Sequence, residues 1–415
     1  MGSFQLSKEQ KIILNLASMS ICSEPQSLII AEEQLKDIDW QNVLLECNAQ
    51  TITLPCFDAL KVYKDHVPDE IFQKWKTISA RIVKNNFDVL IAQTELVSLL
   101  KENGYDYVIM KGTSSADYYV NADLRALGDV DFLINPSKKE EITELLINNG
   151  YIKRDVEHIS HVIFNKPKAH LEMHFEVAGL PETENKDFIR SFLKPAVENT
   201  VETKRDFCIF NAPQHLYHGI IILLHMQHHM IDDGLGLRHL CDWATFVEKT
   251  KEQDFWQKEF IPFAEKIGLF KYMVIMTKVC SKYLSITCPD WALDGDEALC
   301  DAVMEDILTG GNFGRKDDAR ARSGMLIAQK GQKDRGAISN VAYKLHKAIL
   351  LKYPFIKKFW ILYPFVYAWK VVKNLFLMMI GKKSSILKMM PEAQKREQIY
   401  KQLEVFKTNQ TKGEN

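Results

Sequence analysis

The sequence predicts an α+β protein in which a small β-sheet is held between N-terminal and C-terminal helical lobes. Apolar residues recur at helical spacing through most of residues 7–103, and short segments typical of strands follow between residues 107 and 177. Helical patterns return after Pro213. We therefore expect one group of helices to precede the sheet and a second group to follow it.

Length and composition allow two or three domains with real hydrophobic cores, since the chain has 415 residues and 46% of them are hydrophobic. The predicted divisions are 1–104 for an N-terminal helical lobe, 105–212 for a sheet domain, 213–308 for a helical lobe with a histidine-rich helix, 309–340 for a glycine-rich linker or mobile loop, and 341–415 for an aromatic and basic C-terminal helical arm.

The N-terminal lobe is predicted to contain five helices, the last of which ends at Gly104 before the first strand. Its helices are expected at residues 7–19, 26–36, 39–48, 55–64 and 69–103. This lobe is either a surface that selects an acceptor molecule or a plain scaffold, and the pattern does not separate the two.

Two aspartates on one predicted strand indicate chemistry. A strand at 107–110 leads through a Lys-Gly-Thr turn and a polar loop to a second strand, on which Asp129 and Asp131 face opposite to Val130 and Phe132. Like charges so close repel each other, and a divalent cation relieves the repulsion. The plain alternative is that both aspartates are solvated strand-end residues and that the glycine only turns the chain.

A third carboxylate is expected further along the sheet. Ser137 and Glu140 form the pattern of a capping box that opens a helix, which Gly150 ends. A hairpin of strands at 161–164 and 170–177 follows. Alternation along its second strand places His170, Glu172, His174 and Glu176 on the face opposite to the core, with Glu172 as the candidate ligand and Glu176 as the reserve.

These motifs together resemble the DNA polymerase β-type nucleotidyltransferase superfamily, and specifically its bacterial branch of uncharacterised nucleotidyltransferases. The resemblance covers roughly residues 40–250 and lies in three stretches: Lys111-Gly112, then Leu124-Arg125-x-x-Gly128-Asp129-x-Asp131, then Leu171-Glu172-x-His174. It implies a mixed sheet of the nucleotidyltransferase type, with Asp129, Asp131 and Glu172 as catalytic metal ligands. The gap of seventeen residues between Gly112 and Asp129 is longer than the usual superfamily pattern, and Thr113 stands where Ser or Gly is common.

The residue types suggest how two Mg²⁺ ions and a nucleoside triphosphate would be used. One ion held by Asp129 and Asp131 is expected to orient the triphosphate. A second ion shared with Glu172 is expected to lower the pKa of an acceptor hydroxyl for in-line attack at the α-phosphorus.

Nucleotide binding is expected from the glycine turn and from nearby cations. The backbone N–H groups of Gly112 and Thr113 are expected to contact phosphate oxygens, and Gly128 belongs to the same stretch. Lys111 and Arg125 are expected to neutralise charge on the departing pyrophosphate.

The helix after Pro213 carries four histidines within an arc of roughly 80° at 100° per residue, namely His215, His218, His225 and His229. Three interpretations are open. The histidines could form a second metal site, or a face that closes over the nucleotide with His225 or His229 contacting a phosphate or base. Alternatively, they could form a polar contact between helices that is satisfied by hydrogen bonds. His174, His225, His229 and Arg238 are therefore possible accessory residues. Arg238 and Asp242 are spaced to pair with each other on the next helix.

Residues 309–337 hold most of the late glycines, but no Gly-Lys-Ser/Thr follows, so the segment is not a P-loop. It is predicted to be a solvated linker or else a mobile loop that brings Arg315 and Lys316 to a phosphate.

Residues 345–390 combine Trp, Tyr and Phe with Lys around nearly apolar stretches. Lysines and Pro354 and Pro364 interrupt them, so a membrane-spanning helix is not expected. The segment suits either peripheral contact with an anionic membrane or docking into a protein groove, its own or a partner's. Residues 391–415 are expected to begin as a helix and then fray.

Charge and cysteine content restrict the partners and the compartment. The formal net charge of −1 argues against a nucleic-acid polymer and leaves small molecules or proteins as the expected acceptors. Eight cysteines without zinc-binding spacing, and an N-terminus without the layout of a secretory signal, suggest a reducing, cytoplasmic setting that allows peripheral membrane contact.

The favoured function is Mg²⁺-dependent transfer of a nucleoside monophosphate from an NTP to a hydroxyl of a small-molecule or protein acceptor. A catalytically weak nucleotide-binding or antitoxin-like partner protein is the first alternative, because such sites decay without losing the fold. A His/Asp metal-dependent phosphohydrolase centred on the histidine helix is the second.

Overall fold

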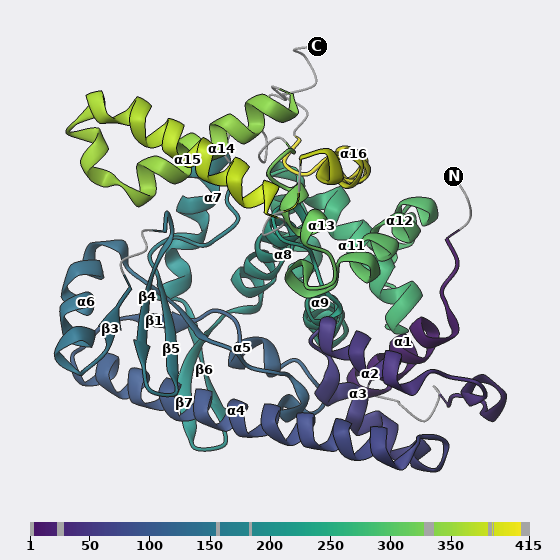
Figure 1. The fold of residues 1–415 in the computed structure, drawn as a ribbon. Helices are drawn as coiled ribbons and strands as arrows, with labels where there is room; N and C mark the ends of the chain where they lie inside the picture. The colour runs from purple at the N-terminus through teal and green to yellow at the C-terminus, as the bar shows by residue number, and fades with distance from the viewer. Residues whose placement is uncertain are drawn as a thin grey trace.

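The structure is a computed structural model that describes residues 4–22, 29–154, 158–181, 185–327, 336–380, 384 and 386–407. It is an α+β fold with a mixed sheet on one side and a packed group of helices on the other (Figure 1). The strands are β1 (Tyr107–Ile109), β2 (Val130–Ile134), β3 (Ile152–Lys153), β4 (His161–Lys166) and β5 (Ala169–His174), with a separate hairpin of β6 (Thr200–Arg205) and β7 (Cys208–Pro213).

Helices surround the sheet in chain order. Those before and within the sheet region are α1 (Lys8–Ile21), α2 (Trp40–Ala49), α3 (Thr53–Leu60), α4 (Asp69–Glu102), α5 (Thr113–Ala116), α6 (Lys139–Asn148) and α7 (Asn185–Leu193). Those after it are α8 (His215–Ile231), α9 (Leu237–Thr250), α10 (Ile261–Lys266), α11 (Phe270–Leu284), α12 (Glu297–Gly310), α13 (Asp318–Ser323), α14 (Ala337–Lys352), α15 (Tyr363–Met379) and α16 (Ile386–Leu403).

The sheet has the order β1-β2-β5-β4-β3 and is mixed, because β2 runs parallel to β5 while the other pairs are antiparallel. The predicted hairpin is β4–β5, which turns at Lys168 with a positive φ of 64°. Phe132, Leu171 and Met173 are completely buried on the core face. The alternation predicted from the sequence is thus the one observed, although β5 ends at His174 and not at Val177.

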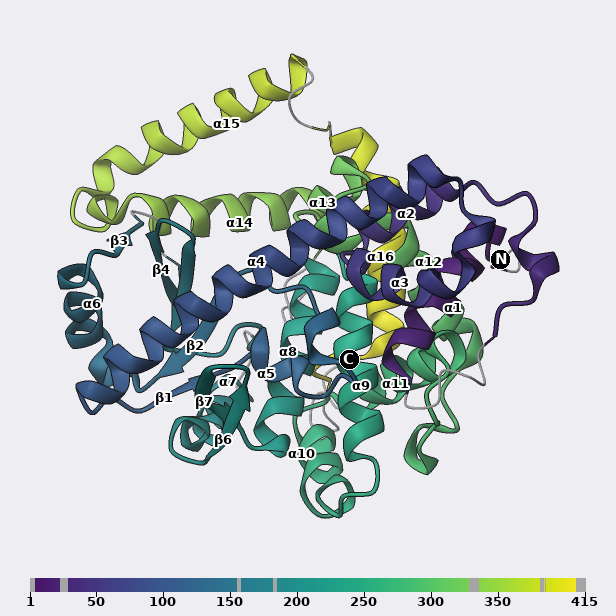
Figure 2. The ribbon, with the colours of Figure 1, turned by 90° about the horizontal axis from the view of Figure 1, so that it is seen from below.

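Helix α4 passes beneath both halves of the molecule (Figure 2). Near its N-terminus, Phe72 and Trp75 pack into the core of the helical half. Near its C-terminus, Leu96 and Leu100 pack into the core of the sheet. One continuous helix therefore contributes to two hydrophobic cores.

The helical core combines the N-terminal helices with α8 to α12, and residues 399–406 join it from the far end of the chain. Segments on both sides of the sheet in sequence are therefore packed directly on each other. The division into five segments stays a prediction.

The structure differs from the predicted helices mainly at their starts. The helix predicted at 26–36 is wrong for the part that the structure describes, where residues 32–35 form only one 3₁₀ turn; residues 26–28 lie outside the described ranges. The capping box at Ser137 is also wrong, because Asn135 accepts from the Ser137 N–H and Pro136–Lys138 form a 3₁₀ turn before α6. Pro213 ends β7.

The glycine-rich segment is packed where it is described, up to residue 327, so the prediction of a solvated linker is wrong there. Gly310 lies against the guanidinium of the buried Arg320, which pairs with Asp306. Arg315 and Lys316 were predicted as phosphate contacts, but Arg315 donates to Thr51 and Lys316 pairs with Glu46. Glycine is needed at 310 because a Cβ there would lie 1.8 Å from the Arg320 side chain.

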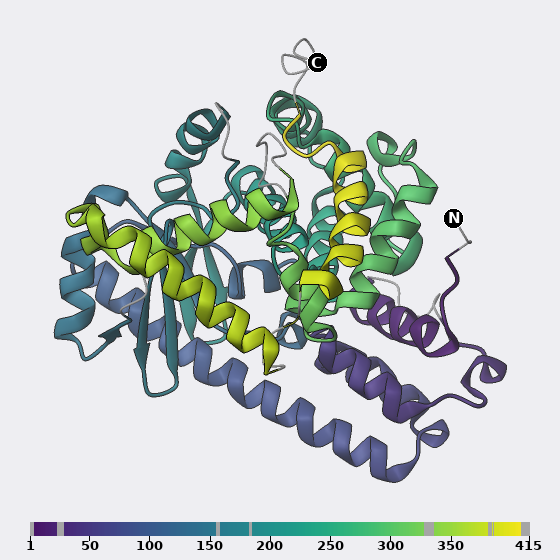
Figure 3. The same cartoon turned by 45° about the horizontal axis from the view of Figure 1, so that its top comes forward.

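The C-terminal region divides into two parts, seen together in Figure 3. Helix α16 docks on the helical core, where the buried Arg396 donates to the carbonyls of Met230 and Ile231 at the end of α8. Helices α14 and α15 form an outlying hairpin. Within the described ranges, no helix is both long enough and apolar enough to cross a bilayer.

Candidate functional site

The predicted site residues gather around one cavity of about 190 Å³ between the polar face of the sheet and helices α8 and α9. Ten of the twelve line it: Lys111, Gly112, Arg125, Gly128, Asp129, Asp131, Glu172, His225, His229 and Arg238. The other two, Thr113 and His174, are buried next to it. Ser115, His239, Asp242 and Phe313 also line the cavity, and none of them was predicted from the sequence to do so.

Three carboxylates meet where β2 lies beside β5. The parallel register places Asp131 opposite Glu172. Carboxylate oxygens of Asp129 and Glu172 lie within 4.8 Å of each other and of a His170 ring nitrogen. Because Asp129 and Asp131 share one face of the sheet, three acidic side chains converge on the cavity.

Two basic groups hold Asp131 in place. The Lys111 ammonium lies 2.8 Å from Asp131 Oδ1, and the His174 Nε2 donates to the same oxygen over 2.9 Å. His174 Nε2 is also 3.5 Å from Glu172 Oε2, so one imidazole lies against two of the carboxylates. Burial lowers the pKa of His174, but its contacts with Asp131 and Glu172 outweigh burial and raise it.

The three carboxylates carry unequal proton affinities. Burial, together with the charges of Asp131 and Glu172, raises the pKa of Asp129 to about 6. Burial also raises the pKa of Asp131, but Lys111 and His174 outweigh it and bring the pKa to about 2. Lys111 therefore compensates Asp131 and leaves Asp129 short of positive charge, which a bound cation would supply.

Histidines surround Glu172 on its other sides. His161 Nε2 lies 3.9 Å and His170 Nε2 3.8 Å from its carboxylate oxygens. Burial raises the pKa of Glu172, but the imidazoles of His170 and His174 nearby lower it overall. His161 was not among the predicted residues, although its place at the start of a strand beside β5 was a usable signal.

The glycine turn has a conformation that requires glycine. Gly112 has φ +60° and ψ −110°, a region closed to residues with a Cβ. The Thr113 hydroxyl donates to Gln93 over 2.7 Å, so it is already occupied by a protein partner. Ser115, two residues further on, lines the cavity.

Arg125 lines the cavity but is held by a buried carboxylate, so its contact with phosphate stays a prediction. Its Nε and Nη2 donate to the two carboxylate oxygens of Asp242, each over 2.7 Å, and both side chains are buried. The Tyr119 hydroxyl donates to Asp242 over 2.8 Å. The pairing predicted between Arg238 and Asp242 is therefore wrong, because Asp242 is occupied by an arginine from the loop before β2.

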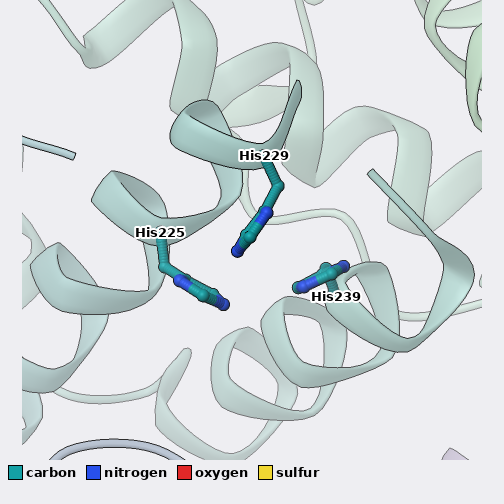
Figure 4. A group of neighbouring side chains, drawn as sticks. All are labelled: His225, His229 and His239. Carbon is teal, nitrogen blue, oxygen red and sulfur yellow. The ribbon is translucent and has the colours of Figure 1, made fainter. Parts of the chain in front are cut away.

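The four histidines predicted to share one face of α8 do not form one group. His215 bonds to Gln253 and His218 to Tyr118, both outside the cavity. His225 and His229 instead converge with His239 of α9, and a ring nitrogen from each lies within 4.8 Å of the others (Figure 4). His239 was missed because nothing in the sequence fixes the angle between α8 and α9.

A second cavity of about 520 Å³ lies at the C-terminal ends of β2 and β5. Apart from the reserve Glu176, its lining contains none of the residues proposed to carry chemistry. Glu176, the reserve carboxylate, lines it and pairs with Arg190, with Oε1 2.5 Å from the Arg190 Nη2. The geometry therefore favours Glu172 over Glu176 as the third carboxylate.

The comparisons with known proteins agree with this geometry. The family model described as "Uncharacterised nucleotidyltransferase" matches residues 36–285, which is more than half of the chain. The chain belongs to this family, and it shares with the family the general assignment of nucleotidyl transfer. No curated protein matches the chain significantly.

We expect the substitution Asp242→Asn to lower the free energy of unfolding by about 3 kcal/mol, because it leaves the buried Arg125 guanidinium without its counter-charge. Chemical denaturation measures the change. The matched control is Asp254→Asn, which breaks an exposed pair with Lys258 and should leave the midpoint unchanged. Equal effects of the two substitutions would contradict the structural role of the buried pair.

We expect Mg²⁺ binding to release protons at pH 6 and not at pH 8. With the pKa of Asp129 at about 6, its carboxyl is half protonated at pH 6, and a metal must displace that proton. Affinity for Mg²⁺ should accordingly fall as the pH drops below 6. Calorimetry in buffers of different ionisation enthalpy measures the release, and Asp129→Asn should abolish it. Proton release that persists in this variant would show that another group is responsible.

Proposed function

We propose that the protein is a Mg²⁺-dependent nucleotidyltransferase that moves a nucleoside monophosphate from an NTP to a hydroxyl of a small-molecule or protein acceptor. One observation carries the proposal: Asp129 just before β2, Asp131 on β2 and Glu172 on the adjacent β5 all line one cavity next to the Gly112 turn. Membership of the nucleotidyltransferase family supports it.

The carboxylates fit a hard divalent cation. Three acidic side chains line the cavity on this side, and burial together with the charges of Asp131 and Glu172 raises the pKa of Asp129. Asp129, Asp131 and Glu172 would hold the metal. Bound Mg²⁺ supplies charge stabilisation to the phosphates and activation of the acceptor hydroxyl.

The chain's own residues fix the carboxylates and approach the phosphates. Lys111 and His174 hold the Asp131 carboxylate from two sides, and His174 aligns Glu172 with it. Gly112 allows the backbone to approach a phosphate oxygen without the obstruction of a side chain. Because Lys111 lies in the cavity beside Asp131, its ammonium also reaches negative charge on a ligand there.

The size of the cavity restricts what enters it. Its volume of about 190 Å³ is below the roughly 300–1,000 Å³ of pockets that enclose whole drug-sized ligands. The phosphates fit inside, whereas the nucleoside and the acceptor extend toward its mouth. Base and acceptor selection therefore depend on residues around the rim.

We expect Glu172→Gln and Asp129→Asn to reduce nucleotidyl transfer by about 10²–10³-fold, because each removes charge used in the transition state. The measurement is pyrophosphate release from each NTP with Mg²⁺, with transfer of the labelled α-phosphate. Glu176→Gln is the matched control, since it is the same change four residues away, on a residue that lines the other cavity. It should leave the rate unchanged.

Two other outcomes would favour the alternative functions. NTP binding without turnover in the wild-type protein would indicate a catalytically weak nucleotide-binding protein. Hydrolysis that survives Asp129→Asn but is lost in His229→Ala would indicate a phosphohydrolase centred on α8.

A further inference from the structure

One cation of the cavity has no hydrogen-bonded or ion-paired partner among the described residues. Of its three cationic side chains, Lys111 is paired with Asp131 and Arg125 with Asp242. The Arg238 guanidinium forms no hydrogen bond or ion pair with any residue in the described part of the chain, and its Nε is fully buried. The guanidinium lies over the Phe313 ring, with Cζ 5.6 Å from the ring centroid.

An uncompensated guanidinium in a low-dielectric site is costly, so its retention indicates an absent anionic partner. Burial and the repulsion from Arg125 lower the pKa of Arg238, which is the direction expected of a cation without a counter-ion. Asp242, the acid nearest along α9, is already bound by Arg125 and Tyr119. The missing anion must therefore come from a ligand.

The histidines beside Arg238 present hydrogen-bond donors. His239 Nδ1 accepts from the Gly236 N–H over 3.3 Å, which places the proton of the neutral imidazole on Nε2. That Nε2 is buried without a partner and is directed toward His225 and His229 (Figure 4). A buried N–H of this kind is satisfied by an acceptor atom such as a phosphate oxygen.

Three convergent histidines also invite a transition metal, but two features disfavour one. Binding through His239 Nε2 would move its proton to Nδ1 and break the bond from Gly236. Arg238 and Lys111, which line the same cavity, would repel a second resident cation. An oxyanion satisfies the same atoms without either cost.

We infer that Arg238, His225, His229 and His239 form a subsite for the terminal phosphates of the NTP, the part that leaves as pyrophosphate. The inference rests on the proposed function. It assigns a role to the side of the cavity that faces the carboxylates, where the side chains are cations and hydrogen-bond donors. A guanidinium binds two phosphate oxygens at once, and the imidazoles add directed donors. The same contacts hold free pyrophosphate.

Binding of inorganic pyrophosphate in the presence of Mg²⁺, followed by calorimetry, tests the subsite. Arg238→Met should weaken pyrophosphate binding at least about tenfold, the loss expected for a charge-assisted contact, and should change AMP binding little. Arg81→Met, on an exposed position of α4, is the matched control and should bind as the wild type. Unchanged melting temperatures would show that the variants remain folded.

Substitutions at His239 distinguish phosphate binding from metal binding at this subsite. His239→Gln keeps an N–H donor but replaces the imidazole by a poor zinc ligand, so pyrophosphate binding should persist, whereas His239→Leu should weaken it. Stoichiometric Zn²⁺ binding that is lost in both variants would overturn the inference, as would full pyrophosphate affinity in Arg238→Met. Transfer that is lost in Asp129→Asn, together with pyrophosphate binding that still depends on Arg238, would support the two proposals independently. Absence of transfer in the wild-type protein would contradict the proposed function but not the pyrophosphate subsite.

A second inference arises from α15. Five apolar side chains of α15 follow each other at alternating steps of four and three residues, and so share an arc of about 80°. They are Phe365, Trp369, Val372, Phe376 and Met379. Each is more than half exposed. Figure 2 shows α14 between this helix and the rest of the molecule. An ordered apolar stripe of this kind on a surface marks an interaction site.

The positive charge of the α14–α15 hairpin indicates which kind of partner its apolar stripe binds. Between Ala337 and Met390 the sequence has ten lysines and no aspartate or glutamate. Lys370 and Lys373 lie near the Trp369 ring. A second copy of the same stripe would bring lysines against lysines, whereas an anionic lipid surface accepts both the aromatics and the charge. The geometry points to the α14–α15 hairpin as a peripheral anchor on an anionic phospholipid bilayer.

Flotation of the full chain with vesicles tests the anchor. The protein should float with vesicles of phosphatidylcholine and phosphatidylglycerol, and not with phosphatidylcholine alone. Trp369→Ser combined with Phe376→Ser should reduce flotation at least about tenfold, since it removes most of the aromatic area of the stripe. Val62→Ser, at an exposed position far along the sequence, should have no effect. Failure to float, flotation unaffected by the double substitution, or a dimer that this substitution dissociates would each overturn the anchor.

Discussion

The parallel pairing of β2 with β5 is the constraint on which the rest of the site depends. It sets Asp131 opposite Glu172 and so concentrates negative charge on one partly buried face. Buried charge must be compensated, and the residues around the pair are those that compensate it: Lys111 and His174 on Asp131, and His170 and His174 beside Glu172. Asp129 is left with the least compensation, which supports the cation proposed for this site.

The Arg125–Asp242 pair connects this face to the helices that close the cavity. Arg125 precedes β2 and Asp242 lies on α9, so one bidentate contact fixes the distance between the acidic wall and the basic wall. The pair also explains why Arg238 has no carboxylate partner among the described residues. Asp242, which helical spacing would pair with Arg238, is bound by Arg125 instead. The structural role of Arg125 thus leaves Arg238 available for the ligand-binding role proposed above.

Periodicity predicted what depends on local sequence. The alternation of β2 and β5 gave the three carboxylates and their common face, and the helical repeat gave nearly the full extent of α4. The failures involve contacts distant in sequence. Nothing between Leu237 and Asp242 reveals that Arg125 will displace Arg238, and nothing near His239 reveals that α9 will turn it toward α8. The capping box failed because Asn135 and Pro136 started a 3₁₀ turn first, and the glycines around Gly310 were taken for flexibility when they serve close packing.

Helix α4 has a consequence for the molecule as a cooperative unit. Its first half belongs to the core that joins the N-terminal and late helices, and its second half to the core of the sheet. A fragment that begins after this helix would expose the apolar surface under β2 and β5, and one that ends before the sheet would expose Leu96 and Leu100. The two halves are therefore expected to unfold in a single transition, and any fragment meant to isolate the sheet must carry α4 with it.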